Sequence, residues 1–224
     1  MNKMNVADAI ATRSSIRAFK PDPVPTDLLM SILESARNTP SNCNTQPWHL
    51  SIVSGDAKDR LAKLLVAEVS KGNPPNGAFA NGMAGLTGTH KERQYECAAC
   101  LYGTMGIGRG DKEERSALMI KNWEFFGAPH VGFVSMPLTM GPTNAIDIGI
   151  YLQSLMLLFT ENGLASCPQG ALAMYPEPIN EIVQIPDGSG VICGISFGYA
   201  DETAQINKTK TPRDTLENTV TFVS

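Results

Sequence analysis

Apolar and polar positions recur along the chain with two different periods, one typical of helices and the other of strands. After Pro25 and Thr26, which together form a helix-start signal, apolar residues follow at helical spacing. The run WHLSIVS at residues 48–54 is instead a β-rich run of strand length. By the same criteria, further helices are predicted at residues 4–12, 55–71, 91–105 and 111–126, and further strands at residues 130–136, 190–200 and 218–224.

The longest apolar stretch, residues 143–164, is apolar almost all round and approaches the length of a membrane-spanning helix. Gly163 ends it in the manner of a helix C-cap. Polar or charged residues interrupt it at Asp147, Gln153, Ser154 and Glu161. We therefore interpret it as a buried helix, in the core or across a subunit interface, and not as a bilayer span.

Helices and strands are interspersed without a regular strand–helix–strand alternation, which favours an α+β fold. No internal repeat and no linker-like stretch divides the chain, so residues 1–224 are expected to form one domain. One long loop, residues 71–90, contains five glycines and two prolines, and long loops inside compact domains are often lids or binding loops.

The net charge limits the classes of partner to be expected, and the cysteine content indicates the redox state of the compartment. A net charge of −4 and a pI near 5.4 argue against a nucleic-acid-binding protein or a basic membrane-surface protein. The N-terminus lacks the apolar core of a secretion signal, and the five cysteines form no even disulfide framework. We therefore expect a cytoplasmic protein with free thiols, no nucleic-acid partner and no membrane partner.

Two arginines and two serines gather in the sequence RSSIR, directly after the first predicted helix. Arg13 and Arg17 flank Ser14 and Ser15, and guanidinium groups bind phosphate oxygens in bidentate geometry. The cluster suits a phosphate monoester, although a solvated turn with ordinary surface arginines explains the same pattern.

The stretch PSNCNTQPW at residues 40–48 carries many amide and hydroxyl groups directly before a predicted strand. Ser41, Asn44 and Gln46 each offer a donor and an acceptor, which is the mixture that a heterocycle edge or a polyol chain requires. An asparagine-rich turn leading into the strand explains the composition equally well.

The cysteines lack the sequence partners that metal binding or nucleophilic catalysis would require. Cys97 and Cys100 form a CxxC, but none of the three histidines is spaced as a zinc partner, and the pair also suits plain helix packing. Cys167 stands before Pro168 with no local base, so a packed thiol is the favoured interpretation. We expect no metal site and no hydrolytic triad.

Taken together, RSSIR and PSNCNTQPW resemble the two N-terminal signatures of the nitroreductase family of flavoenzymes. The branch that the chain resembles most acts on nitrobenzoate-like or nitrobenzene-like aromatics. Later segments resemble the family in the same order, and the matches cover most of the chain outside residues 72–110: KNWEFFGAPHVGFV, DIGIYLQSLMLLFTENGLASCPQGALAMY, CGISFGYAD and NKTKTPRDTLENTVTF.

The resemblance implies a nitroreductase-like fold, with a central mixed sheet surrounded by helices, in an intertwined homodimer that holds two FMN molecules at the subunit interface. It implies that Arg13, Ser15 and Arg17 hold the FMN phosphate and the polar edge of the flavin. Arg213 matches a second phosphate-binding arginine of the family. Ser14 stands where the family commonly has an arginine beside the first one.

The remaining flavin contacts implied by the resemblance come from two places. The amide-rich stretch falls where the family contacts the isoalloxazine and ribityl groups. Gln169 and Gly170, which follow Pro168, occupy the place where a backbone N–H approaches flavin N5.

The implied activity is hydride transfer from NADH or NADPH to flavin N5, and from there to a nitroaromatic acceptor, in a ping-pong sequence with quinones as side acceptors. The cofactor carries the redox step, so no catalytic histidine is required. Phe125 and Phe126 are candidates for stacking an aromatic substrate over the ring, with core packing as the alternative. Two further alternatives are the same fold with dehalogenation or enone reduction, and a flavin-binding protein without catalysis.

Overall fold

A four-stranded sheet forms the centre of the computed structural model, which describes residues 4–79 and 85–223. The strands lie in the order β1-β2-β4-β3, and every neighbouring pair is antiparallel. A bridge between Ser15 and Ser166 adds a parallel pairing to this sheet. The strand bounds are β1 His49–Ser54, β2 His130–Pro137, β3 Ala165–Gln169 and β4 Ser189–Gly198.

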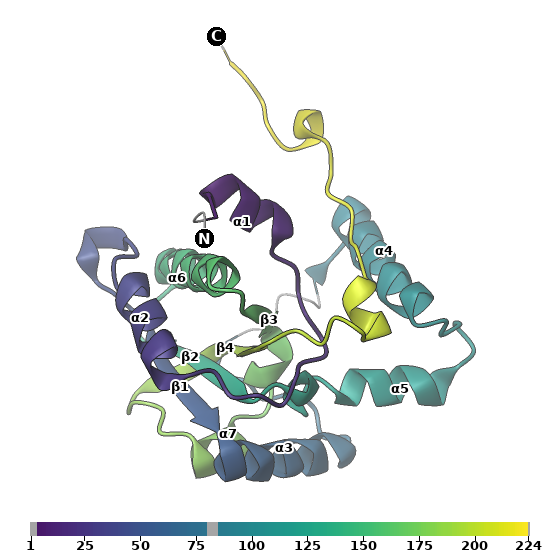
Figure 1. Ribbon diagram of the computed structural model, residues 1–224, viewed down its shortest axis with the longest axis horizontal. Helices are drawn as coiled ribbons and strands as arrows, with labels where there is room; N and C mark the ends of the chain where they lie inside the picture. Colours follow the sequence, from purple (N-terminus) through teal and green to yellow (C-terminus); the bar gives the residue numbers. More distant parts are fainter. Residues whose placement is uncertain (1–3, 80–84, 224) are drawn as a thin grey trace.

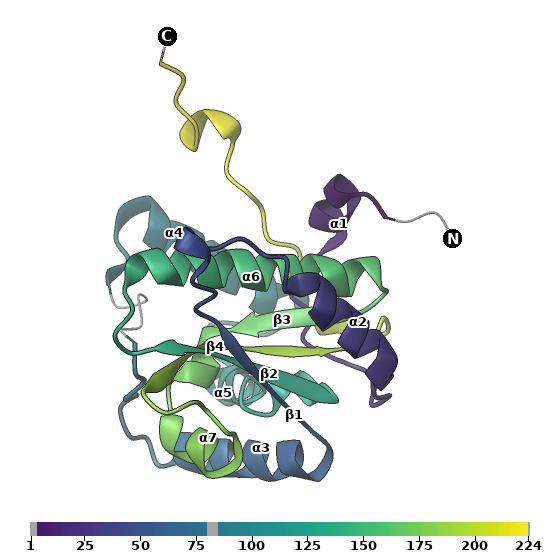
Figure 2. The same ribbon diagram turned by 90° about the vertical axis from the view of Figure 1, so that its left-hand side faces the viewer.

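Helices cover both faces of the sheet, which gives the α+β architecture expected from the sequence (Figures 1 and 2). On one face lie α2 and α6, and on the other lie α3 and α7. The helix bounds are α1 Val6–Thr12, α2 Thr26–Ala36, α3 Gly55–Ser70, α4 Gly88–Thr104, α5 Lys112–Ile120, α6 Pro142–Glu161 and α7 Pro176–Ile182.

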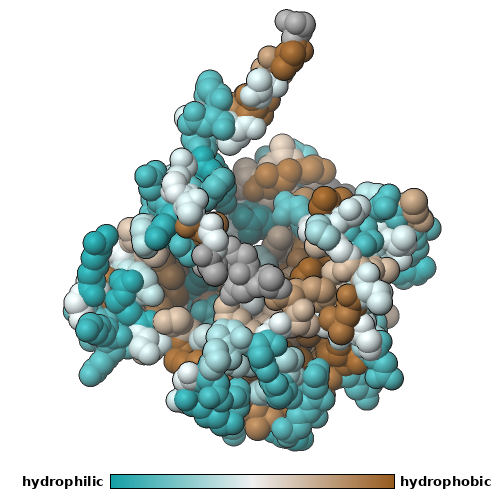
Figure 3. Space-filling view, turned by 180° about the vertical axis from the view of Figure 1, so that it is seen from behind, coloured by the Kyte–Doolittle hydropathy of each residue, from teal (hydrophilic) through white to brown (hydrophobic). Residues whose placement is uncertain are grey.

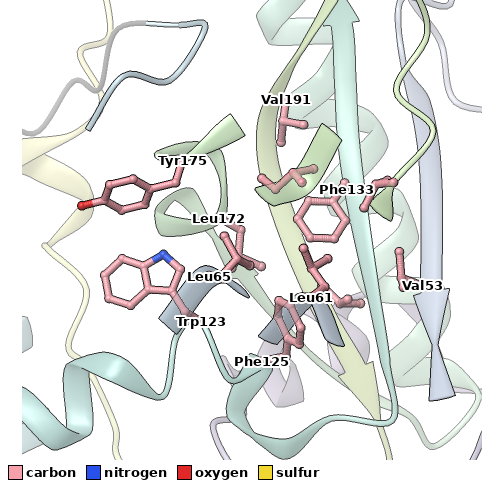
Figure 4. Close-up of a cluster of buried hydrophobic side chains, with 12 residues drawn as sticks. Val53, Leu61, Leu65, Trp123, Phe125, Phe133, Leu172, Tyr175 and Val191 are labelled. Carbon is pink, nitrogen blue, oxygen red and sulfur yellow. The ribbon is translucent and has the colours of Figure 1, made fainter. Parts of the chain in front are cut away.

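The first of the two main core layers lies between the sheet and α3. Leu61 and Leu65, one helical turn apart, both point at the sheet and are fully buried. Phe133 of β2 meets them from the sheet side, and Trp123 and Tyr175 close one end of the layer (Figure 4).

The second main layer lies between the sheet and α6. Tyr151, Leu155 and Phe159 occupy one stripe of this helix at spacings of four residues, and all three are buried. Phe159 stacks on Phe197 of β4 with ring centroids 4.7 Å apart. The opposite stripe of α6 is open, because Ile146 is 64% exposed. The predicted burial of this helix is therefore confirmed on one face only within this chain.

Three of the predicted strands are confirmed as β1, β2 and β4. The predicted strand at residues 218–224 is wrong for the described part: a short 3-10 turn, Leu216–Asn218, is followed by backbone that is assigned to no strand. Two elements were missed. β3 is short and contains a proline, and α7 is only seven residues long, so neither carries a clear periodic signal.

The predicted helix at residues 111–126 is too long, because α5 ends at Ile120. A tight turn follows, in which Phe125 and Phe126 have positive φ angles of 56° and 54°. The glycine-rich loop is confirmed as a long connection between α3 and α4, although its residues 80–84 lie outside the described residues.

Candidate functional site

The arginine segment, residues 13–17, leaves the end of α1 and runs beside β3. The backbone N–H of Ile16 donates to the carbonyl oxygen of Ser166 at 3.1 Å, and Ser15 bridges the same residue. Burial raises the pKa of the neighbouring Cys167 thiol to about 11, while the charges of Arg17 and Arg13 act in the opposite direction. Both guanidinium charges therefore act on the buried thiol of Cys167, two residues before the end of β3.

Asn207 fixes this segment from the C-terminal side of the chain. Its Oδ1 accepts from the backbone N–H of Arg17 at 2.7 Å, and its Nδ2 donates to the carbonyl oxygens of Ala18 and Asp201, each at 2.8 Å. The side chain of Arg17 makes one long contact within the described part of the chain, from Nη1 to the Ser15 carbonyl at 3.4 Å. Sequence reasoning missed Asn207, because nothing local distinguishes it from its polar neighbours.

The β3 corner, residues 168–170, is where the strand ends and a 3-10 turn begins. Pro168 and Gly170 are exposed, whereas Gln169 is 3% exposed. The amide of Gln169 is used internally: Nε2 donates to the Asn122 carbonyl at 2.8 Å, and Oε1 accepts from the Ser196 hydroxyl. A ligand at this corner would therefore meet backbone atoms and not the Gln169 side chain.

Close packing sets the position of this corner. Leu172, two residues beyond it, is fully buried against β4, and a Cβ added to Gly194 would lie 2.4 Å from Leu172 Cδ1. Only a glycine at position 194 allows this approach without a shift of Leu172.

The polar turn, residues 41–46, holds a backbone conformation that side chains disfavour. Cys43, Asn44 and Gln46 have φ angles of 50°, 56° and 45°, and each such residue costs on the order of 1 kcal/mol. Hydrogen bonds inside the turn compensate, because Ser41 Oγ accepts from the Gln46 N–H at 2.9 Å and Gln46 Nε2 donates to the Asn44 carbonyl at 3.1 Å. Strain of this kind is concentrated at binding sites.

Within one chain, the polar turn and the arginine segment lie towards different ends of α6. The turn is held near the start of the helix, where Asn42 N–H donates to Asp147 Oδ1 at 3.0 Å. The arginine segment lies beside Ser166, which follows the end of the helix (Figure 2). The described hydrogen bonds and contacts do not bring these two groups of residues together.

The C-terminal segment, residues 209–223, carries Arg213 past α4. Its Nη1 donates to the carbonyl oxygens of Thr211 at 3.1 Å and of Pro212 at 2.9 Å, and the next residue, Asp214, forms an ion pair with Arg93 of α4. A cavity of about 840 Å³ lies between the two elements. Arg213 is thus placed beside α4, and its role at a phosphate stays a prediction.

Comparison with known proteins decides the family. The family model described as "Nitroreductase family" matches residues 10–199, a range that includes the arginine segment, the polar turn and the β3 corner. The chain belongs to the nitroreductase family.

Three relatives match this nitroreductase over nearly its whole length. A 4-nitrobenzoate reductase from Pseudomonas putida is 33% identical over 96% of this chain and 93% of its own. The FMN-dependent nitroreductase NfnB from Mycobacterium smegmatis, solved in complex with NADPH, is 37% identical, with a TM-score of 0.92 over 98% of this chain and 100% of that chain. The FMN and NADPH-dependent nitroreductase NfnB from sphigopyxis sp. strain HMH gives a TM-score of 0.95 at 34% identity, over 99% of this chain and 100% of that chain.

The prediction that Phe125 and Phe126 stack on a substrate is wrong, because both side chains are buried in the core. Phe125 is 0% exposed and meets Phe133 edge-on, with ring centroids 6.3 Å apart. Phe126 is 7% exposed and packs with Phe19 and Cys167. The positive φ angles turn both rings into the core, which is the alternative that the sequence left open.

All five cysteines are free, and no group of three histidine, cysteine or acidic residues able to hold a metal ion occurs among residues 4–79 and 85–223. In the same ranges, no helix is both long enough and apolar enough to cross a membrane.

The charged, amide and backbone groups described above fit FMN. Two guanidinium groups near the end of β3 suit a phosphate, the exposed amides of Asn44 and Gln46 suit a heterocycle edge, and the β3 corner exposes backbone at Gly170. Apart from Arg213, which lies beside α4, the cofactor-binding residues named from the sequence thus form two groups on a single chain, one towards each end of α6.

Proposed function

We propose that this protein is an FMN-dependent oxidoreductase that uses a nicotinamide to reduce nitroaromatic compounds. The observation that carries the proposal is the pairing of the arginine segment with Ser166 of β3, which brings the charges of Arg13 and Arg17 to bear on Cys167, next to a corner with exposed backbone. Similar proteins that are named for nitroaromatic reduction support the same conclusion. When bound, FMN supplies the two-electron transfer between nicotinamide and acceptor.

The protein's own residues bind and orient the cofactor. The guanidinium groups of Arg13 and Arg17, with the hydroxyls of Ser14 and Ser15, would hold the phosphate by charge-assisted hydrogen bonds. Backbone N–H groups at the β3 corner would approach the reactive edge of the flavin ring, since the Gln169 side chain is already paired inside the protein. Donors aimed at that edge stabilise negative charge that develops there.

The polar turn would hold the other side of the cofactor. Ser41, Asn44 and Gln46 together offer hydroxyl and amide groups of both polarities, which suit the flavin's pyrimidine edge and its ribityl chain. None of these cofactor-binding roles requires a side chain that gains or loses a proton. The three histidines of the chain therefore need no catalytic role.

We also propose an intertwined homodimer, in which one chain's polar turn completes the site that begins at the other chain's arginine segment. The stripe of α6 that carries Ile146 and Ile150 is exposed, and so are Val6 and Ile10 of α1. Apolar area of this kind on neighbouring helices supports an interface.

The C-terminal segment supports the same dimer. It projects from the body of the chain, and Figure 3 shows hydrophobic residues along it at the top of the view; Phe222 and Val223 are 87% and 93% exposed. The outer edge of β1 pairs with no other strand among the described residues. An open edge and an unpaired apolar segment suit strand addition between two copies. Sedimentation of the full chain should give a dimer, and removal of residues 216–224 should shift it towards monomer; a monomeric full chain would refute this proposal.

The five free cysteines support a reducing compartment, so we propose a cytoplasmic location. NADPH is named with both of the similar structures described above and is therefore the first reductant to test.

Absorption spectroscopy tests the proposed function directly. The purified protein, reconstituted with FMN, should show a flavin spectrum that bleaches when NADPH or NADH is added anaerobically. Addition of 4-nitrobenzoate should then restore the oxidised spectrum. Bleaching without reoxidation by any nitroarene would favour dehalogenation or enone reduction, and bound flavin that neither nicotinamide reduces would favour a non-catalytic flavin-binding protein.

A further inference from the structure

Among the described residues, α6 makes one contact with the polar turn and another with Trp48, which follows it. At the start of the turn, the backbone N–H of Asn42 donates to Asp147 Oδ1 at 3.0 Å. After its end, Trp48 stacks on Tyr151, with ring centroids 4.8 Å apart and planes within 8°. Asp147 and Tyr151 are separated by one helical turn, so they lie on the same face of α6.

Asp147 is an unusual residue for the buried face of an apolar helix. It is 4% exposed, and within the described part of the chain its Oδ2 is buried without a hydrogen-bond partner. A buried carboxylate with one partner lowers stability relative to an apolar side chain of similar size. Packing of α6 therefore does not account for Asp147, whereas its contact with the polar turn does.

The turn needs such an external contact, because its own hydrogen bonds do not orient it relative to the sheet. Cys43, Asn44 and Gln46 all have positive φ, and all three are exposed. The acceptor is fixed in place, because α6 packs firmly against the sheet. The bond from Asn42 to Asp147 therefore limits the positions that the Asn44 and Gln46 amides can take before any ligand arrives.

We propose that Asp147 is a positioning residue for the cofactor: it orders the polar turn through Asn42 and does not itself touch the flavin. This inference rests on the proposed function. It predicts that removal of the carboxylate lowers FMN affinity mainly by disordering residues 41–46, since binding must then restore that order.

Titration with FMN and amide hydrogen exchange together test this role. Asp147→Ala should raise the FMN Kd about tenfold, the loss expected for one charge-assisted hydrogen bond. The same variant should speed amide exchange in residues 41–46 of the FMN-free protein. Asp147→Asn keeps an acceptor oxygen, and its Kd should stay within about threefold of the wild-type value. Ile179→Val, a mildly destabilising change in the core on the opposite face of the sheet, should alter neither quantity.

The outcomes separate this inference from the proposed function. A wild-type protein that binds no FMN would overturn both. If the wild type binds FMN and Asp147→Ala binds it equally well, the inference fails while the proposed function stands. Equal changes in Kd for Asp147→Ala and Ile179→Val would show a general loss of stability, and would likewise overturn the positioning role. Should Asp147→Ala fail to fold, unprotected amides in residues 41–46 of the wild-type protein would refute the ordering that the inference requires.

Discussion

The backbone N–H of Arg17 donates a hydrogen bond to Oδ1 of Asn207, 2.7 Å away and 190 residues later in the chain. The same asparagine holds the carbonyl oxygens of Ala18 and Asp201 through Nδ2. This side chain thus ties Arg17 to the end of β4, and backbone hydrogen bonds from Lys20 to Tyr199 and from Asp201 to Ala18 hold the residues that follow. The arginines that suit a phosphate are therefore positioned by a residue that carries no charge.

Asn207→Ala removes all three of these hydrogen bonds and loosens the hold on Arg17, while the backbone pairing between Phe19 and Ala200 remains. We expect the FMN Kd to rise about tenfold, because the arginines must be ordered during binding. Fluorescence titration of FMN measures this change. Gln205→Ala, which removes a neighbouring amide whose Nε2 contacts the Thr104 carbonyl, is the matched control. Unchanged affinity in Asn207→Ala would contradict the role given to this residue.

Arg17→Gln should weaken the binding of FMN by at least about tenfold and leave the binding of riboflavin almost unchanged. The physical reason is that riboflavin lacks the phosphate on which the guanidinium would act. Parallel titrations with the two flavins measure the difference. Arg37→Gln removes an exposed arginine that pairs with Glu34, and it should affect neither ligand. Equal losses for both flavins would show that Arg17 acts on the fold and not on the phosphate.

His130 makes folding stability depend on pH. Its Nε2 accepts from the backbone N–H of Val24 at 2.9 Å, and its ring stacks on Phe197. Burial, assisted by the charge of Lys58, lowers the pKa of His130 below its ordinary value of 6.5. The unfolded chain therefore takes up the proton more readily, so the contribution of His130 is complete above pH 6.5 and is lost as the pH falls below it.

Urea denaturation of the wild type and of His130→Gln at pH values on either side of 6.5 measures this contribution. The difference in the free energy of unfolding between the two proteins should shrink as the pH falls, because only the wild type carries the titrating ring. Profiles that stay parallel across this range would exclude His130 as the source of the pH dependence.

Gly194→Ala should destabilise the protein by about 1–3 kcal/mol, the usual cost of overpacking a core. The added Cβ would lie 2.8 Å from the Cβ of Leu172, which is fully buried and cannot move aside easily. Thermal unfolding measures the loss. Gly103→Ala, at an exposed position of α4 where a Cβ meets nothing within 4 Å, is the control and should not destabilise. A neutral Gly194→Ala would mean that Leu172 repacks freely.

The sequence alone determined the elements whose signals are local. The runs that became β2 and β4 are largely apolar and the run that became β1 is rich in β-forming residues, so their place in a sheet follows from composition. The candidate flavin-binding groups were named through the resemblance of two short motifs to the nitroreductase family, because their chemistry alone also suits solvated turns.

The tertiary structure decided which predicted elements and side chains make contacts with the rest of the chain. Residues 218–223 have a strand-like pattern but pair with no strand of their own chain, because a strand forms only where another backbone satisfies its hydrogen bonds. Phe125 and Phe126 could not be assigned to a pocket or to the core from their positions alone, and the positive φ angles that bury them arise from the turn after α5. Asn207 carries no local signal, and Asp147 stood out in the sequence only as a charged residue within an apolar stretch. Their effect depends on contacts made across 190 and 105 residues of sequence, and only the folded chain brings such distant groups within hydrogen-bonding distance.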